Sequence, residues 1–328
     1  MKNNKSPTNI EFVRNNKIVK KLILIDGFLR SGKSMVGPIL GSFAGVEIIR
    51  SEPILESLPL FYHFDKISRD AAIALLRQEL DMKLYNSMIS RNTNFRFNDI
   101  TGVFRNVNSF RYFKRLFFKD GNIVLERIRT ERSILQVEVH DMLQFIDLYF
   151  EALGEGLRFI EMVRHPVDLV FTKTGPAFEN CLKANPRHWG HLIISKKGEV
   201  PHYAFGWIDE FVNETPMNRA IKILKRQTEK ARMKYKTLSK NQESQILFIP
   251  FEKFATFPYK YLDLISNFID SEVTGKTKRA LKMQKVPRII NPVVKENKMK
   301  LIKEKASKEC LDILDDLINE YEKKYLIP

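Results

Sequence analysis

The chain has 328 residues, of which 44% are hydrophobic, and it carries a formal net charge of +16. This length allows one large α/β domain or two modest ones, and no apolar run approaches the roughly 18 residues that a membrane-spanning helix needs. Its two cysteines, Cys181 and Cys310, exclude a disulfide framework and a cysteine-rich metal site. The N-terminus lacks the apolar core of a signal peptide, so we expect a cytoplasmic protein without a membrane span.

The basic charge is concentrated toward the ends of the chain. Residues 1–17 are rich in Asn and Lys and have no hydrophobic periodicity, so we expect them to form a disordered basic tail. Residues 18–328 contain no clear linker and no internal repeat, which predicts a single α/β domain.

The stretch 22–34 is the most informative part of the sequence. Its leading apolar residues predict a buried strand, and a glycine turn then leads into a helix. Strand, glycine-rich turn and helix together present free backbone N–H groups and the positive end of a helix to an anion. We therefore expect this loop to bind a phosphate-like group. Its spacing matches the phosphate-loop pattern in full, with the key positions at Gly27, Ser31, Gly32, Lys33 and Ser34.

Two features between this loop and residue 120 allow alternative interpretations. A second strand is expected at 46–49, and Glu52 follows it, either at the ligand-binding edge of the sheet or as a cap of the next helix. A helix is expected over 68–90. Aromatic and basic residues alternate over 95–119, a pattern typical of amphipathic elements with solvent-reaching Arg and Lys, and less often of single-stranded nucleic-acid binding.

Short apolar strands then alternate with helices. A strand over 133–140 ends at His140, a helix follows over 142–153, and a strand over 157–163 leads directly to Arg164. This alternation predicts a three-layer α/β fold whose central sheet is mostly parallel, with a phosphate-loop-like topology.

Residues 173–206 interrupt the alternation with Gly, Pro and aromatic residues, and we expect them to form an irregular flap. The remaining elements resume the earlier pattern. A basic helix, a last strand and two closing helices are expected at 217–238, 245–250, 258–270 and 298–325.

Three motifs in this order resemble those of the sulfotransferases that use 3′-phosphoadenosine 5′-phosphosulfate. The resemblance spans residues 22 to about 270 and implies a fold like that of nucleotide kinases, in an enzyme that transfers sulfuryl groups. The motifs are the loop at 27–34, the segment 159–168 with Thr172 eight residues after Arg164, and the segment 249–254 followed by Pro258.

The resemblance implies roles in binding this donor. The loop would hold the 5′-phosphosulfate, with Arg30 stabilising the bridging oxygen as it departs. Arg164 and Thr172 would bind the 3′-phosphate through a guanidinium fork and a hydroxyl. Phe251 would lie against the adenine or belong to the core. The product would be adenosine 3′,5′-bisphosphate, and no metal is implied.

Two features depart from the family pattern. Lys33 replaces the usual threonine and restores the lysine of phosphate-loop kinases. The glycine-rich basic motif that closes the donor site in cytosolic sulfotransferases is absent near the C-terminus, and Lys285 and Arg288 are the candidates to replace it.

The acceptor hydroxyl needs a general base, and two residues compete for this role. Glu52, which we prefer, lies close to the position of a glutamate in tyrosylprotein sulfotransferases and bacterial relatives, whereas His140 lies near the histidine base of cytosolic sulfotransferases. The acceptor is a carbohydrate, a lipid, a peptide or a small metabolite. In the flap, His188, Trp189 and Tyr203 are candidates for binding it.

The sequence thus predicts a sulfotransferase that acts by in-line transfer. The alternative is a phosphate-loop kinase that uses ATP and Mg²⁺, with Lys33 on the phosphates and Ser34 on the metal. Such a kinase also needs an acidic residue at a strand end, for which Glu52 and Glu138 are open candidates. A nucleic-acid-binding protein that uses 95–119 is the least expected class.

Overall fold

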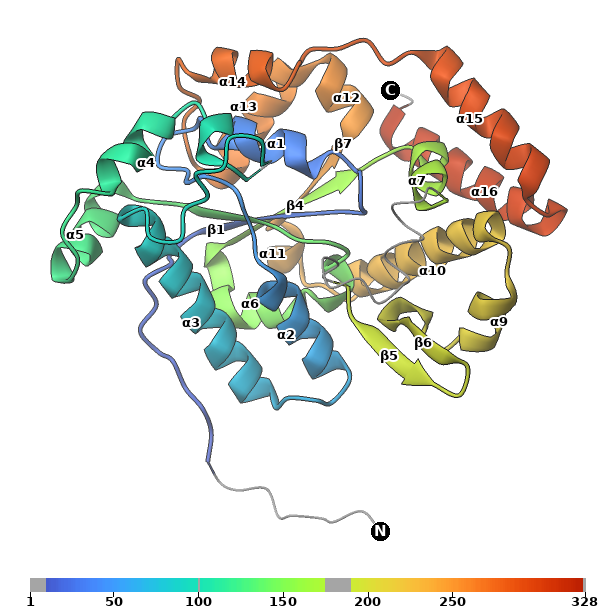
Figure 1. The fold of residues 1–328 in the computed structure, drawn as a ribbon, viewed down its shortest axis with the longest axis horizontal. Helices are drawn as coiled ribbons and strands as arrows, with labels where there is room; N and C mark the ends of the chain where they lie inside the picture. Colours follow the sequence, from blue (N-terminus) through green and yellow to red (C-terminus); the bar gives the residue numbers. More distant parts are fainter. Residues whose placement is uncertain (1–9, 100, 175–189, 327–328) are drawn as a thin grey trace.

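The computed structural model describes residues 10–99, 101–174 and 190–326, and its centre is a five-stranded parallel sheet (Figure 1). Neighbouring strands pair in parallel across the whole sheet. This arrangement confirms the predicted α/β class with a parallel central sheet. The strand order is β2-β3-β1-β4-β7, with bounds Arg50–Ser51, Leu135–Glu138, Leu22–Asp26, Leu157–Val163 and Ile246–Pro250.

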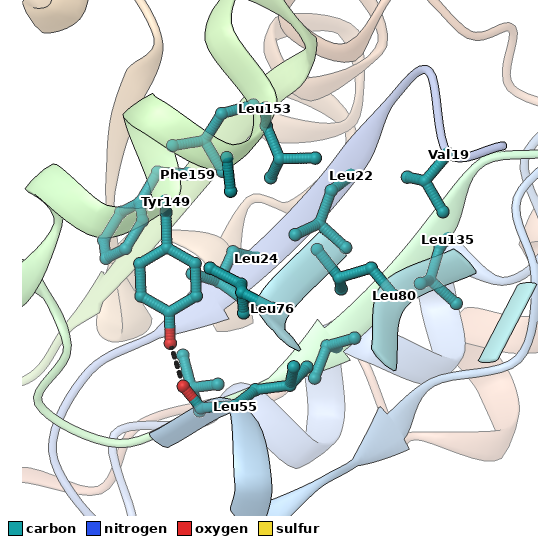
Figure 2. Packing of buried hydrophobic residues seen from close by; sticks show 14 of the residues in the cluster. Val19, Leu22, Leu24, Leu55, Leu76, Leu80, Leu135, Tyr149, Leu153 and Phe159 are labelled. Atoms are coloured by element: carbon teal, nitrogen blue, oxygen red, sulfur yellow. Dashed lines mark hydrogen bonds between the residues drawn. The ribbon is translucent and has the colours of Figure 1, made fainter. Parts of the chain in front are cut away.

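One face of the sheet is covered by α3 (Arg69–Met88) and α6 (Asp147–Leu153). Figure 2 shows this core, in which the leucines of β1 lie against leucines of α3. Tyr149 of α6 belongs to the same core, and its hydroxyl donates a hydrogen bond of 2.7 Å to the Leu55 carbonyl. This bond satisfies a polar group that burial would otherwise leave without a partner.

The other face is covered by α1 (Lys33–Leu40) and α13 (Pro258–Ile269), whose apolar side chains pack with Ile23 and Ile25 of β1. Because successive side chains of a strand point to opposite faces, the alternation of Leu and Ile along β1 serves both cores. Every residue of β1 is buried, as expected of a parallel strand covered on both faces.

The other elements surround these layers. A two-stranded antiparallel hairpin consists of β5 (Leu192–Ser195) and β6 (Gly198–Pro201). Among the described residues, none of the helices is both long and apolar enough to cross a membrane. The remaining helices are α2 (Pro53–His63), α4 (Ser109–Arg115), α5 (Asn122–Glu131), α7 (Pro166–Lys173), α9 (Ile208–Asn213), α10 (Pro216–Lys236), α11 (Lys240–Glu243), α12 (Phe251–Thr256), α14 (Thr277–Met283), α15 (Pro292–Lys305) and α16 (Lys308–Tyr321).

The second strand begins later than the predicted 46–49. Only Val46 forms an isolated bridge there, and β2 follows at Arg50. The Gln136 side chain of β3 donates a 2.7 Å hydrogen bond to the Glu47 carbonyl, so a side chain takes the place of a ladder bond. Hydrophobic periodicity carries no signal for such a contact, which explains the wrong strand position.

The single C-terminal helix predicted at 298–325 is also wrong, because two helices occupy this region. Helix α15 ends at Lys305 and α16 begins at Lys308. Ser307 separates them, since its hydroxyl oxygen accepts a 3.3 Å hydrogen bond from the Cys310 N–H and caps the second helix.

Part of the predicted flap over 173–206 has regular structure, the β5–β6 hairpin. Its sequence signal is the pair Ile193-Ile194 followed by Gly198, which has φ +95° and begins β6 directly after the two-residue turn. Residues 175–189, which include the predicted acceptor-binding residues His188 and Trp189, lie outside the described residues.

The described part of the predicted tail, residues 10–17, contacts α3. Asp81 of α3 accepts hydrogen bonds from the Arg14 side chain and from the backbone N–H groups of Ile18 and Val19, at 2.8 to 2.9 Å. The division of the chain into a tail and one domain stays a prediction.

A buried ion network connects α4 to the segment before β2. Glu47 is fully buried, and its carboxylate accepts hydrogen bonds from Arg115 Nη1 at 2.6 Å and from the Tyr112 hydroxyl at 2.9 Å. Arg111 and Ser87 also donate to it. Burial would raise the pKa of Glu47, but the guanidiniums of Arg111 and Arg115 outweigh this effect and hold the pKa at about 2.

Glu47→Gln should destabilise the protein by roughly 3–5 kcal/mol, because it keeps the side-chain shape but leaves the buried Arg115 guanidinium with less counter-charge. The folded pKa of Glu47 lies below its ordinary value of 4.5, so the stability from its charge is complete above that pH and is lost as pH falls toward about 2. Denaturant titrations should therefore show a large difference from the unmodified protein at neutral pH and a smaller one in acid.

Glu229→Gln is the control for this prediction. Glu229 is an exposed residue 4.0 Å from Lys225, and its substitution should leave the free energy of unfolding nearly unchanged. Equal stability of Glu47→Gln and the unmodified protein at neutral pH would contradict the role given to the buried carboxylate.

Candidate functional site

The loop between β1 and α1 has the predicted strand–turn–helix geometry, and two of its glycines are required by close approaches. Gly27 has φ +133°, and a Cβ atom there would lie 2.4 Å from the Met162 carbonyl oxygen. Gly32 has φ +109°, and a Cβ atom there would lie 2.4 Å from Cδ2 of Phe251. Only glycine allows the loop to pass this close to β4 and to Phe251. The loop continues into α1 with Gly32 as the N-cap, so the positive helix end faces the loop.

Lys33 and Ser34, at the start of α1, have different partners. The Lys33 side chain is buried, and its ammonium donates to the carbonyls of Gly27 and Phe28, the latter at 3.0 Å. Ser34 Oγ lies 3.3 Å from Oε1 of Glu138, the last residue of β3. Lys33 thus fixes a positive charge within the loop, while Ser34 connects the helix to the neighbouring strand.

Arg164, the first residue after β4, lies beside the loop. Its Nη1 donates a hydrogen bond of 2.6 Å to the Arg30 carbonyl. Its guanidinium carbon lies 4.4 Å from the centroid of the Phe251 ring, and its Nε lies 3.5 Å from Oδ2 of Asp168. Because the Phe251 ring also packs against Gly32, Arg164 and the loop occupy the same side of the sheet edge.

A second guanidinium lies next to the first. The Arg288 guanidinium carbon is 5.9 Å from the centroid of the same Phe251 ring, and its Nη2 is 2.8 Å from Sδ of Met35 in α1. Burial, and then the charge of Arg164, lower the pKa of Arg288. Two adjacent positive charges favour an anion as their common partner. Lys285, the other predicted replacement for the missing basic motif, is exposed in the turn after α14.

Three further residues predicted for the site have contacts within the fold. Phe251 is buried in the core that also contains α1, in addition to its contacts with the guanidiniums. The Thr172 hydroxyl donates a 2.9 Å hydrogen bond to the Asp168 carbonyl of its own helix. Tyr203 packs in a small cluster with Trp207, whose Nε1 donates a 2.9 Å hydrogen bond to the Tyr203 carbonyl.

The two predicted general bases have different surroundings. Glu52 is paired with cations, since its Oε2 lies 2.9 Å from Nζ of Lys83 and its Oε1 lies 3.9 Å from Nη1 of Arg50. His140 instead has Nδ1 at 2.9 Å from Oε1 of Glu56. Sequence reasoning missed Glu56. Its signal was the spacing of four residues from Glu52, because Glu52 is the N-cap of α2 and Glu56 lies in the first turn of that helix.

Burial and the Lys33 charge set the protonation of the His140–Glu56 pair. Burial, and then Lys33, lower the pKa of His140 to about 4, so the imidazole is neutral at neutral pH. Burial raises the pKa of Glu56 to about 7, against an opposing effect of Lys33. As a carboxylate, Glu56 accepts a hydrogen bond from Nδ1–H of His140, and this tautomer leaves a lone pair on Nε2.

Two buried carboxyls, one at the end of β1 and one within β4, border a cavity. Asp26 and Glu161 lie opposite each other in the register of β1 and β4, and burial raises the pKa of both. Asp26 Oδ2 accepts hydrogen bonds of 2.8 and 2.9 Å from the backbone N–H groups of residues 142–143. The cavity measures about 150 Å³, and Phe28 and Arg164 also line it, so it lies next to the loop. Sequence reasoning did not identify Glu161.

No family model matches the chain, and no curated protein matches it. Solved structures similar to it include the sulfotransferase domain from the Synechococcus PCC 7002 olefin synthase, at 14% identity and a TM-score of 0.49 over 96% of this chain and 98% of that one. Sulfotransferase STF9 from Mycobacterium avium aligns at 11% identity and a TM-score of 0.48, over 95% and 78% of the two chains. The sulfotransferase domain from the curacin biosynthetic pathway aligns at 11% identity and a TM-score of 0.45, over 80% and 78%. At these values, function has to be argued from the site itself.

Lys33→Met should raise the pKa of His140 from about 4 toward its ordinary value of 6.5 without reaching it, since one charge is removed while burial remains. An NMR titration of the His140 imidazole in the folded protein measures this shift. Lys83→Met removes a charge that is paired with Glu52 and should leave the titration unchanged. If the pKa of His140 is the same in Lys33→Met as in the unmodified protein, the ammonium does not act on the imidazole.

Proposed function

We propose that this protein is a sulfotransferase that moves a sulfuryl group from 3′-phosphoadenosine 5′-phosphosulfate to a hydroxyl group. The observation that carries the proposal is the contact between Arg164 and the phosphate loop, at 2.6 Å from the Arg30 carbonyl oxygen. A nucleoside that carries anionic groups at two positions needs two anion sites within reach of one ligand. The loop supplies one such site, and the neighbouring guanidiniums of Arg164 and Arg288 supply the other.

One buried polar atom at these sites fits such a donor. Ser31 Oγ has no hydrogen-bond partner among the described residues, whereas Arg164 Nε faces the Asp168 carboxylate at 3.5 Å. Buried polar atoms without partners are costly, and the oxygens of phosphate and sulfate accept hydrogen bonds well. We assign Ser31, Lys33 and Ser34 to the 5′-phosphosulfate and the two guanidiniums of Arg164 and Arg288 to the 3′-phosphate.

Arg30 is assigned to the charge that develops during transfer. The donor supplies a sulfuryl group on a phosphate leaving group, and transfer of this kind is accelerated chiefly by positioning and electrostatics. Arg30 has φ +68° and an exposed side chain, and its carbonyl is held by Arg164. A non-glycine residue in this conformation is strained, and the hydrogen bond from Arg164 helps to keep it there.

His140 is the better supported of the two candidate bases. The Glu56 carboxylate, 2.9 Å from Nδ1, orients the ring so that Nε2 can take a proton from the acceptor hydroxyl. The Glu52 carboxylate is instead occupied by an ion pair with Lys83 at 2.9 Å, and no second residue among those described orients it toward an acceptor in the way that Glu56 orients His140. We therefore give His140 the role of base, Glu56 that of positioning residue, and reverse the preference for Glu52 drawn from sequence.

A phosphate-loop kinase is the second candidate, and one contact favours it. Ser34 Oγ lies 3.3 Å from the Glu138 carboxylate at the end of the adjacent strand, which is where such kinases hold the serine and acid that bind Mg²⁺. A kinase has no use for a second anion site at Arg164 and Arg288, so we rank it below the sulfotransferase.

Adenosine 3′,5′-bisphosphate should raise the thermal midpoint of the protein without any metal, in a differential scanning measurement. Binding stabilises the folded state by about 2.7 kcal/mol when the ligand is at about 100 times its Kd. Arg164→Ala and Arg288→Ala should each weaken binding roughly ten- to a hundredfold, since each removes charged hydrogen bonds of about 1.5–3 kcal/mol. Arg226→Ala, which removes an exposed partner of Glu210, is the matched control and should keep the full shift.

A larger shift with ATP and Mg²⁺ than with the bisphosphate, retained in both Arg164→Ala and Arg288→Ala, would support the kinase and exclude the sulfotransferase. Sulfuryl transfer from the labelled donor to a panel of hydroxyl acceptors then tests the reaction itself.

The rate of transfer should rise with pH through about 7, because Glu56 must be ionised to leave Nε2 of His140 free. His140→Ala should lower kcat by about 10²–10⁴-fold. Glu56→Gln should remove the inflection near neutral pH from the plot of transfer rate against pH. Glu52→Gln should retain both the inflection and most of kcat. The opposite pattern, with kcat lost in Glu52→Gln and kept in His140→Ala, would assign the base to Glu52.

A further inference from the structure

Helix α4 buries polar side chains and exposes apolar ones, which is the reverse of the usual pattern in a surface helix. Its inward face consists of Tyr112 and Arg115, each 1% exposed, whose polar groups bind the buried Glu47 carboxylate. Its outward face and the turn that follows it carry Phe113, which is 52% exposed, and Phe117, which is 78% exposed. An ordinary amphipathic helix would bury the phenylalanines and expose the arginine.

The outward apolar side chains come from one short stretch of the chain, from α4 through the turn that follows it to the start of α5. Helices α4 and α5 lie at the left of Figure 1, on the opposite side of the molecule from α15 and α16. We call this surface the α4 face. Its large exposed hydrophobic residues are Phe110, Phe113, Leu116, Phe117, Phe118 and Ile123.

The α4 face also carries an excess of positive charge, since its one acidic residue before Ile123, Asp120, is paired with Arg91. Residues 101–119 include five Arg and Lys and no Asp or Glu. Arg111 and Arg115 bind Glu47. Among the described residues, the exposed side chains of Arg105, Lys114 and Lys119 form no ion pair. An exposed surface that combines large apolar side chains with uncompensated bases fits a partner that offers both hydrocarbon and anionic groups.

The contacts of the rings argue against nucleic acid as this partner. Stacking on bases requires free ring faces. Phe97 and Phe104, beside the α4 face, stack on each other with centroids 4.2 Å apart, and the guanidinium carbon of Arg127 lies 4.1 Å from the centroid of Phe118. Phe113 and Phe117 meet edge to face at 6.0 Å. The rings are therefore engaged with one another and with a cation, and they offer a strip of hydrocarbon.

We propose that the α4 face binds the surface of a membrane that contains anionic lipid. The phenylalanines enter the boundary between headgroups and acyl chains, and the flanking lysines and Arg105 contact lipid phosphates. The buried ion network around Glu47 holds α4 in the orientation that keeps its apolar side outward. This proposal is independent of the sulfotransferase assignment, because none of its residues belongs to the loop or to the guanidinium pair.

Vesicle sedimentation tests this proposal with the full chain. The unmodified protein should bind vesicles of phosphatidylcholine mixed with phosphatidylglycerol at least about tenfold more tightly than vesicles of phosphatidylcholine alone. Phe113→Ser/Phe117→Ser should lose about tenfold or more of the binding to the mixed vesicles. Lys114→Glu/Lys119→Glu should lose a similar factor on mixed vesicles and little on neutral ones.

Ile194→Ser/Phe205→Ser is the matched control, because it removes two exposed hydrophobic residues from the hairpin region at the lower right of Figure 1. It should bind mixed vesicles like the unmodified protein. Thermal midpoints of all variants should stay close to the unmodified value, since the altered side chains are exposed, and this separates lost binding from lost folding.

Three results would overturn the proposal. The first is no binding to mixed vesicles at moderate salt. The second is equal binding by the Phe113→Ser/Phe117→Ser variant and the unmodified protein. The third is tight, salt-dependent binding of a single-stranded oligonucleotide that the lysine variant loses while vesicles are not bound, which would identify nucleic acid as the partner.

Discussion

The hydrogen bond from the Arg164 guanidinium to the Arg30 carbonyl joins the rigid end of β4 to the turn that precedes α1. Phe251 lies under the same guanidinium and against Gly32, where any Cβ atom would collide with its ring. The position of the loop, the conformation of Arg30 and the direction of Arg164 are therefore fixed together. This arrangement keeps the two anion sites at a constant separation, because neither the loop nor Arg164 can move without the other.

Lys33 connects this arrangement to the proton chemistry of the site. Its ammonium is held by loop carbonyls inside a buried region that also contains several carboxyls, so its charge opposes the rise in pKa that burial gives to Asp26 and Glu56. The same charge lowers the pKa of His140 and keeps its ring neutral. A threonine at this position would supply no such charge. The departure from the sulfotransferase pattern at Lys33 thus has a local electrostatic consequence that does not depend on a kinase reaction.

The sequence predicted the parallel sheet and the order of its elements because hydrophobic periodicity and the phosphate-loop spacing are local signals. The resemblance to sulfotransferases, carried in part by the segment 159–168, predicted Arg164 as a site residue. The sequence did not predict Glu56, whose contact with His140 joins residues 84 positions apart. It also placed the second strand wrongly, because the Gln136 side chain substitutes for a ladder bond. Both errors arise from contacts between side chains that are distant in sequence. The periodicity of hydrophobic residues does not indicate such contacts.

The segment 95–119 shows a second limit of prediction from sequence patterns. Its alternation of aromatic and basic residues predicted an amphipathic element whose Arg and Lys reach solvent, whereas Arg115 is buried and Phe113 and Phe117 are exposed. Periodicity separates two faces of a helix but does not say which one is buried. Here the choice is made by Glu47, a buried carboxylate that requires positive partners and takes them from Arg111 and Arg115. Once those two arginines turn inward, the helical spacing obliges the phenylalanines to turn outward. The exposed apolar face is thus a geometric consequence of one buried charge, and it persists for as long as that charge is satisfied.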